Sequence, residues 1–398
     1  MMELLRDRQA LALLLAASLT ILSNATISPA LPGIEAAFAE TPDAALLTRL
    51  LVTAPSLAVA LFAPFAGMAV DRYGRRPFLL AGVGLFALSG SAGLILPDLH
   101  MFLASRLLLG LALAMLMTAQ AALVGDLFEG AARGRFMGFQ MAATNFGGFV
   151  FVAFAGWLAG VNVFLVFALY GVGLLYLPFL WRAIPATRPP RNVRAAGSDG
   201  EGDAAGPWVL QLAFLVLLAG VTFVLFYVVP TQVPFHLARI GHADPAAAGL
   251  VVATVPLAAG CAAFAFGALR RRMGPGGTPA LGFAVMGAGF LLLSAAVLLP
   301  AMAAAVALIG CGFGLVLPGF IASALDVAPP ARRGLASGAM TTSIFLGQFI
   351  SPLAMQPAVE AIGYVDAFRI AALVLAALSV TVLVGLRPPR EKALHQAG

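Results

Sequence analysis

The stretch that decides the fold reads Gly-Met-Ala-Val-Asp-Arg-Tyr-Gly-Arg-Arg and occupies residues 67–76. Its charged part, residues 71–76, stands between two segments without any charged residue, 50–70 and 77–97. A helix that crosses the roughly 30 Å hydrocarbon core of a bilayer needs about 20 apolar residues, and each segment is long enough. Residues 67–76 are therefore predicted to form a short loop between two membrane-spanning helices, with basic residues near the lipid headgroups.

The same alternation of apolar runs and short polar loops extends along the whole chain. Of the 398 residues, 61% are hydrophobic and only 10% are charged, whereas a soluble globular chain carries about 25% charged residues. The longest charge-free runs are long enough for two spans, with breaks near residues 160–162 and near Pro300. Counting the runs predicts an all-α membrane protein with twelve transmembrane helices. The first run is too long for a cleaved signal peptide, which favours a retained helix.

The basic residues are distributed unevenly over the predicted loops. An even number of spans puts both termini on one side, and 19 of the 23 Lys and Arg residues fall on that side. Such an excess marks the cytoplasmic loops of a membrane protein. We therefore expect a multi-pass protein of the inner membrane with both termini in the cytoplasm. The net charge of +6, distributed in this way, indicates a lipid surface and no nucleic acid as partner.

Several residues recur at a constant offset of 200 positions. Gly67, Arg72, Gly74, Gly110, Asp126, Arg133, Gly134 and Gly138 return as Gly267, Arg272, Gly274, Gly310, Asp326, Arg333, Gly334 and Gly338. A constant offset predicts two pseudo-repeated six-helix bundles that arose by duplication. We place the N-terminal bundle in residues 1–181, a cytoplasmic linker rich in Pro, Gly and Arg in 182–207, and the C-terminal bundle with a short tail in 208–398.

The stretch 67–76 matches the signature between helices 2 and 3 of the major facilitator superfamily, which it resembles over its full length. The run Ser-Asn-Ala-Thr-Ile-Ser-Pro at residues 23–29 is similar to helix 1 of the twelve-span drug–proton antiporters in that superfamily. The resemblance implies a cytoplasmic latch in which Asp71 contacts the start of helix 11 and Arg75 pairs with Asp126. The implied gating residues are Gly67, Asp71, Arg72, Gly74, Arg75, Arg76 and Asp126. A positive-inside loop with a chance aspartate is the alternative.

Arg106 is the one charge inside a predicted span, four residues before Gly110. An intramembrane arginine is costly, so it usually faces protein or a water-filled cavity. In the drug–proton antiporters that this chain resembles, the matching arginine serves proton coupling, which implies that role for Arg106. A structural arginine whose charge reaches the outer interface is the alternative, and both readings stay open.

In this superfamily, helices 1, 4, 7 and 10 line a central cleft, and helices 2, 5, 8 and 11 lie beside it. Polar and aromatic residues of these helices are the candidate substrate-binding set: Asn24, Met117, Gln120, Gln140, Asn145, Thr222, Phe226, Tyr227 and Gln348. The set contains amides, hydroxyls and aromatic rings but no carboxylate, which suits a neutral or anionic amphiphile better than a cation. Each of these side chains has a second explanation, because polar residues also join helices in membranes.

The expected function is secondary active transport of a small solute by alternating access, with proton-coupled efflux as the leading mode. The glycines at 147 and 148 lack the proline that usually accompanies them in the antiporters, so proton symport or uniport of a neutral or anionic metabolite is the alternative. A non-transporting membrane sensor is a distant third. Hydrolase, metalloprotease and dinucleotide-binding motifs are absent from the sequence, so we expect no enzyme. We expect no cofactor or metal, protons and a small solute as partners, and a monomer in the bilayer.

Overall fold

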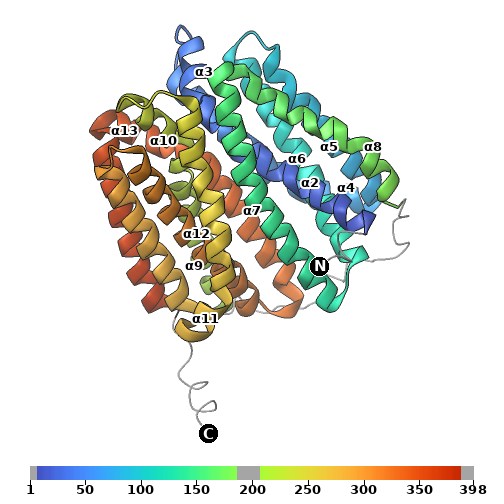
Figure 1. Ribbon diagram of the computed structural model, residues 1–398. Coiled ribbons are helices and arrows are strands. Elements are labelled where there is room, and N and C mark those ends of the chain that lie inside the picture. The colour runs from blue at the N-terminus through green and yellow to red at the C-terminus, as the bar shows by residue number, and fades with distance from the viewer. Residues whose placement is uncertain (1–6, 186–206, 387–398) are drawn as a thin grey trace.

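The computed structural model describes residues 7–185 and 207–386, and every regular element in these ranges is a helix (Figure 1). The first range contains α2 (Arg8–Ala25), η1 (Ser28–Ala30), α3 (Leu31–Ala37), α4 (Ala44–Tyr73), α5 (Arg75–Ser91), η2 (Ala92–Leu94), α6 (Leu99–Leu127), α7 (Gly130–Val161), η3 (Val163–Gly171) and α8 (Val172–Ala183). The second contains α9 (Pro207–Phe226), α10 (Val228–Arg239), α11 (Pro245–Ala295), α12 (Leu299–Val327), η4 (Pro330–Arg332) and α13 (Arg333–Gly385).

Local sequence explains where several helices begin. The carboxylate of Asp98 accepts hydrogen bonds from the amides of His100 and Met101, and thereby caps the start of α6. Asp244 caps α11 in the same way. Pro29 interrupts the first apolar run, which continues as a 3₁₀ turn and then as the short helix α3.

Ten helical segments among the described residues are long and apolar enough to cross a membrane. Two of them are much longer than a single crossing requires: residues 245–295 of α11 and residues 333–385 of α13 span 51 and 53 residues. Each of these contains one glycine with a non-helical, positive φ, Gly274 at 76° in α11 and Gly363 at 80° in α13. The helix axis therefore breaks at both glycines. Glycine adopts such a backbone conformation readily because it lacks a Cβ.

The sequence repeat has counterparts in the packing. A Cβ on Gly110 would lie 2.2 Å from the carbonyl oxygen of Pro55, and one on Gly310 would lie 2.4 Å from that of Val255. Both pairs join the same two helices of their own repeat, and both positions differ by 200 residues between repeats. Gly74, at φ 96°, likewise corresponds to Gly274. The offset in the sequence therefore marks equivalent helix contacts.

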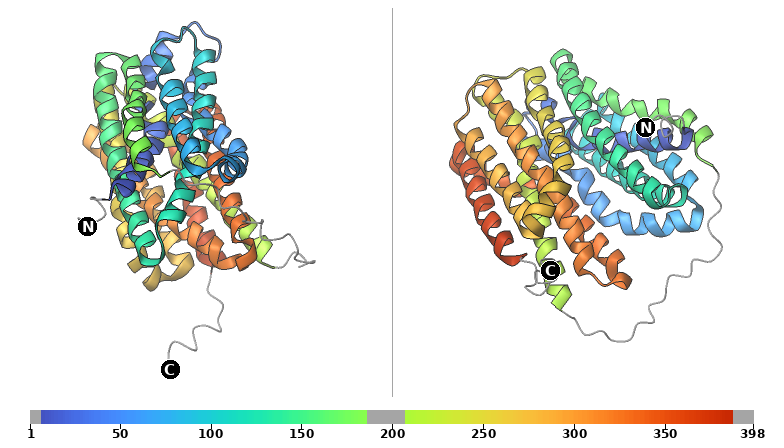
Figure 2. Two further views of the ribbon diagram at one scale, coloured as in Figure 1. Left: turned by 90° about the vertical axis from the view of Figure 1, so that its right-hand side faces the viewer. Right: turned by 60° about the horizontal axis from the view of Figure 1, so that its bottom comes forward.

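The helices of residues 7–185 and those of residues 207–386 form two groups that lie side by side (Figure 2). In Figure 1, α3 and α10 lie together at the upper end, and the turn inside α11 that carries Arg270, Arg271 and Arg272 lies at the lower end. We call the end with α3 and α10 the α3–α10 face, and the end with the arginine-rich loops the basic face. Residues 186–206, which include most of the predicted linker, lie outside the described residues.

Candidate functional site

The two groups of helices touch closely along α7 and α11 near the α3–α10 face. A Cβ on Gly156 of α7 would lie 2.8 Å from the Cα of Gly249 on α11, so the two backbones are in direct contact. Further along, Gly148 faces Pro256 at 3.1 Å and Gly260 faces Asn145 at 2.9 Å, measured from the same constructed Cβ atoms. Small residues permit this approach, as they do at other helix crossings in membranes.

Toward the basic face the same two groups separate. No atom lies within 4 Å of a Cβ built on Gly138 of α7 or on Gly338 of α13, and the same is true of Gly134 and Gly334. Every hydrogen bond recorded between the two groups, within the described residues, lies between the α3–α10 face and the level of Ser56 and Gln348. The structure is therefore closed at the α3–α10 face and separated at the basic face.

A cavity of about 250 Å³ lies between the two groups of helices, beside the crossing of α7 and α11. Four of the predicted substrate-binding residues line it, namely Asn145, Phe226, Tyr227 and Gln348. Phe226 stacks on Phe313 with 3.7 Å between the ring centroids, and the Ser56 hydroxyl donates to Oε1 of Gln348. Its lining consists of apolar, aromatic and amide residues and includes no Asp, Glu, Lys or Arg from the described part of the chain. Such a surface binds by apolar contact and orients a ligand through a few hydrogen bonds.

Three other predicted residues, Met117, Gln120 and Gln140, line a separate cavity of about 340 Å³ within the N-terminal group. Nε2 of Gln120 donates to the Leu13 carbonyl over 2.9 Å, so this amide also joins two helices. Thr222 lines neither cavity, because its buried hydroxyl donates to the Leu218 carbonyl in its own helix. The side chain of Asn24 lies outside the described part of the structure.

Arg106 is completely buried inside the N-terminal group and lines neither of these cavities. One guanidinium nitrogen donates to the Gly90 carbonyl over 2.8 Å, and the group lies over the rings of Phe167 and Tyr170 at 5.1 and 4.9 Å from their centroids. Its Nε and second terminal nitrogen have no partner among the described atoms. Arg106 therefore faces packed protein.

At the basic face, Arg75 forms an ion pair with Asp126 over 2.7 Å, the contact expected from the resemblance. Asp326, the repeat counterpart of Asp126, pairs with Arg270 over 3.1 Å. Arg76 donates to the Trp181 carbonyl and lies over its ring, which ties the loop to the end of α8. Gly67 and Arg72 make no such tie: Gly67 is in ordinary contact with Thr118, and Arg72 is exposed. The side chain of Asp71 lies outside the described part of the structure, so its latch contact stays a prediction.

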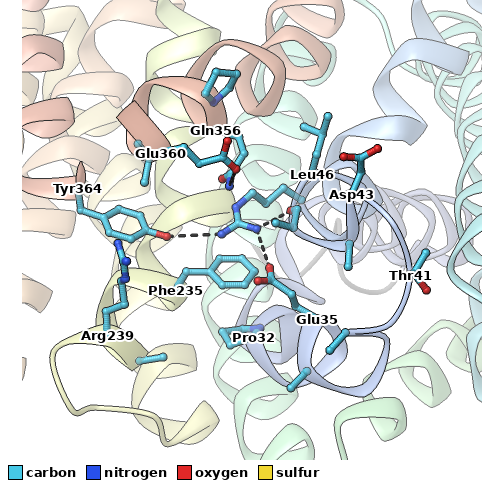
Figure 3. Close-up of a pocket in the computed structure, with 18 residues that line it drawn as sticks. Pro32, Glu35, Thr41, Asp43, Leu46, Phe235, Arg239, Gln356, Glu360 and Tyr364 are labelled. Carbon is cyan, nitrogen blue, oxygen red and sulfur yellow. Dashed lines mark hydrogen bonds and ion pairs between the residues drawn. The ribbon is translucent and has the colours of Figure 1, made fainter. Parts of the chain in front are cut away.

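A further cavity, between the two groups of helices, was not expected from the sequence. It measures about 1020 Å³, lies between the two groups at the α3–α10 face, and is drawn in Figure 3. Glu35, Arg49, Arg239 and Glu360 line it together with Tyr364. Arg49 is only 3% exposed, and its guanidinium lies 2.7 Å from the carboxylate of Glu35. The sequence carries no signal for this burial, because Glu35 and Arg49 stand at the ends of the first two apolar runs, where charges normally meet lipid headgroups or water.

Comparison with known proteins agrees with this architecture. A family model described as Major Facilitator Superfamily matches residues 13–352 and, in a second match, residues 215–398. Among curated relatives, the chain is 27% identical over 312 residues to the tetracycline resistance protein, class G, of Vibrio anguillarum. The aligned region covers 76% of this chain and 78% of that relative. It is 32% identical over 113 residues to multidrug resistance protein 2 of Bacillus subtilis (strain 168), a match that spans only 28% of either chain.

Solved structures share the fold at low sequence identity. The crystal structure of a D-xylose–proton symporter superimposes with a TM-score of 0.75 at 17% identity, covering 96% of this chain and 98% of that one. The inward-open xylose transporter XylE from E. coli gives 0.74 at 16% identity, covering 95% and 96%. The human organic anion transporter MFSD10 gives 0.67 at 19% identity, covering 94% and 99%.

Proposed function

Because the chain belongs to the Major Facilitator Superfamily, we propose that this transporter exports a small amphiphilic solute by alternating access, in exchange for protons. It is a multi-pass membrane transport protein and not an enzyme. The observation that carries the proposal is the central cavity, whose walls come from both groups of helices: Asn145 from the first group, and Phe226, Tyr227 and Gln348 from the second. A site shared between two bodies changes its access when they rock against one another.

Two observations support export of an amphiphile. The lining of the central cavity is largely apolar and aromatic, with amides to orient a ligand, which suits a solute that also partitions into lipid. The curated relatives are named for resistance to tetracycline and to multiple drugs. Proton coupling rests on the resemblance that assigns it to Arg106, which would act through the packing of the N-terminal group because it lines no central surface.

The topology is part of the same proposal. A crossing takes about 20 residues, so α11 and α13, each broken at a glycine, cross twice and bring the ten candidate spans to twelve. The twelve form two six-helix bundles, residues 1–181 and 208–398, joined by the linker 182–207. The basic face lies in the cytoplasm of an inner membrane together with both termini, and the described conformation is then inward-open. The gating set at this face opens and closes it, and a monomer suffices for transport.

A second candidate is symport or uniport of a neutral or anionic metabolite. It is favoured by the absence of any carboxylate from the described lining of the central cavity, since a proton exchanger commonly uses one there. The two candidates differ in the effect of a pH gradient on the direction of net movement.

Counterflow in proteoliposomes separates the candidates. We expect the protein to exchange labelled tetracycline, with uptake against its gradient when the compartment of uptake is the more acidic one. Exchange of D-xylose, or tetracycline movement that ignores the pH gradient, would favour the second candidate. Phe226→Ala and Gln348→Ala should each lower exchange about ten-fold. The first removes an aromatic side chain from the wall of the cavity, and the second removes an amide that orients the solute. Thr222→Val is the matched control, since Thr222 is buried but lines neither cavity, and it should exchange at the wild-type rate.

A further inference from the structure

Arg49 is a buried cation at the one end where the two groups of helices are closed. It is 3% exposed, lies in α4, and pairs with Glu35 of the adjacent segment α3 over 2.7 Å. A carbonyl one turn earlier in α4, that of Ala45, also accepts from its guanidinium. These contacts hold the guanidinium within the N-terminal group and supply its counter-charge.

The guanidinium also contacts the C-terminal group, and the dashed line that ends at the labelled Tyr364 in Figure 3 marks one of these contacts. Its Nε donates to Oε1 of Gln232 over 3.1 Å, and a terminal nitrogen lies 3.5 Å from the hydroxyl of Tyr364. Its carbon lies 3.7 Å from the centroid of the Phe235 ring, within the range of a cation–π contact. Arg49 is the only charged side chain in the described ranges that hydrogen-bonds from one group to the other.

Gln232, a partner of Arg49 in the C-terminal group, belongs to a further chain of hydrogen bonds. Gln232 donates to Gln356 over 3.3 Å, and Gln356 donates to Glu360 over 2.7 Å, so a chain of side chains runs from one carboxylate to the other. Other charged groups near the cavity are Asp43 and Arg239, the latter lying 5.6 Å from the centroid of the Tyr364 ring. The planar guanidinium has enough donors to serve Glu35 and the C-terminal partners at once, which a lysine ammonium cannot match in geometry.

We propose that Arg49 is the lock of the gate at the α3–α10 face, and that Glu35 is the residue that positions it. The inference rests on alternating access as proposed above. When this face opens, Arg49 must leave Gln232, Phe235 and Tyr364, while Glu35 travels with it in the same group. The guanidinium is then never an unpaired buried charge, which would be far more costly than the lost hydrogen bonds. The cavity of about 1020 Å³ beside it leaves room for water to replace the lost partners.

The prediction is that removing the lock shifts the resting state toward opening at this face. In a background with Cys261→Ser and Cys311→Ser, Val252→Cys reports from the seam between α7 and α11, where Val252 is 2% exposed. Adding Arg49→Ala should raise labelling by a membrane-impermeant maleimide from the α3–α10 face at least about ten-fold, because hydrogen bonds to a charged group are lost and each is worth about ten-fold or more. Labelling of Gly338→Cys from the basic face should fall in parallel.

Three further variants test the assignment. Arg49→Lys keeps the charge beside Glu35 but not the planar set of guanidinium donors. It should give a rise in labelling between those of the wild type and Arg49→Ala. Gln232→Leu removes the partner on the other group while Arg49 stays paired, so it reports on the lock even if Arg49→Ala fails to fold. Arg369→Ala is the matched control, because Arg369 pairs with Asp366 within one helix and is 58% exposed. It should leave labelling unchanged.

Unchanged labelling in both Arg49→Ala and Gln232→Leu would overturn the lock, as would an equal rise in Arg369→Ala. The labelling needs neither substrate nor a pH gradient. Failure of tetracycline exchange, with labelling behaving as stated, would therefore count against the proposed substrate or coupling and leave the lock standing.

Discussion

Arg106 is a buried cation with two guanidinium nitrogens that have no partner among the described atoms. Arginine stays protonated in proteins, so its role in coupling would be electrostatic, acting on whatever group takes the proton. Contacts with Phe167 and Tyr170 stabilise the charge by up to about 2 kcal/mol for a desolvated cation on an aromatic face. The residue is thus built into the packing of the N-terminal group and not into the cavity wall.

If Arg106 has the proposed role in coupling, Arg106→Ala should abolish uphill transport driven by a pH gradient, while exchange of tetracycline at equal concentrations on both sides continues. The two activities are measured in the same proteoliposomes. Wild-type uphill transport in Arg106→Ala would show that this arginine serves packing alone. Arg106→Lys is the companion variant: it keeps the charge but cannot reproduce the bond to Gly90 and both ring contacts, so we expect partial uphill transport.

Single residues also show where sequence reasoning reaches its limit. The pair Arg75–Asp126 could be anticipated because it follows a recognisable loop signature. The pair Glu35–Arg49 could not, because each residue stands at the end of an apolar run, where a charge normally meets lipid headgroups or water. Only the packing of α3, α4 and α10 makes Arg49 a buried group. Hydropathy carries no information about which distant helices meet.

At the level of elements, apolar run length was the reliable guide. The predicted breaks near residues 160–162 and Pro300 correspond to the end of α7 at Val161 and the start of α12 at Leu299. The helix break at Tyr227, between α9 and α10, was not predicted, although Pro230 follows it by three residues and cannot donate a hydrogen bond to the carbonyl of Phe226. That break matters, since Tyr227 lines the central cavity. Side-chain exposure within helices was least predictable. Thr222 was predicted to bind substrate, but its hydroxyl is buried and donates to the Leu218 carbonyl in its own helix.

The crossing of α7 and α11 gives a prediction about a whole element. A side chain on Gly156 would collide with the backbone of α11, whereas Gly160, one turn further along α7, has nothing within 4 Å of its Cβ position. Gly156→Leu should therefore prevent closure at the α3–α10 face and lower tetracycline exchange at least ten-fold, roughly the cost of overpacking a tight contact. Gly160→Leu is the matched control and should exchange normally. Equal activity of the two variants would mean that this crossing need not close during transport.

At the scale of the whole molecule, the repeat and the asymmetry between the two faces are the main features. The repeat was visible in the sequence because glycines at close helix approaches, such as Gly110 and Gly310, tolerate no side chain. The conformation was not visible, because under the proposed alternating access the same residues must pack in each of two states of similar free energy. The structure gives one of these states, closed at the α3–α10 face.

The most direct test of alternating access measures both faces in one preparation. Spin labels at Gly138→Cys and Gly338→Cys report the width of the basic face, and labels at Glu40→Cys and Ala243→Cys report the α3–α10 face, where both residues are exposed. Pulsed electron–electron distance measurements in lipid should give a long first distance and a short second one at rest. Adding tetracycline and a pH gradient should shift part of the population to a short first distance and a long second one. Distances that stay unchanged, or that lengthen or shorten together at both faces, would contradict the account.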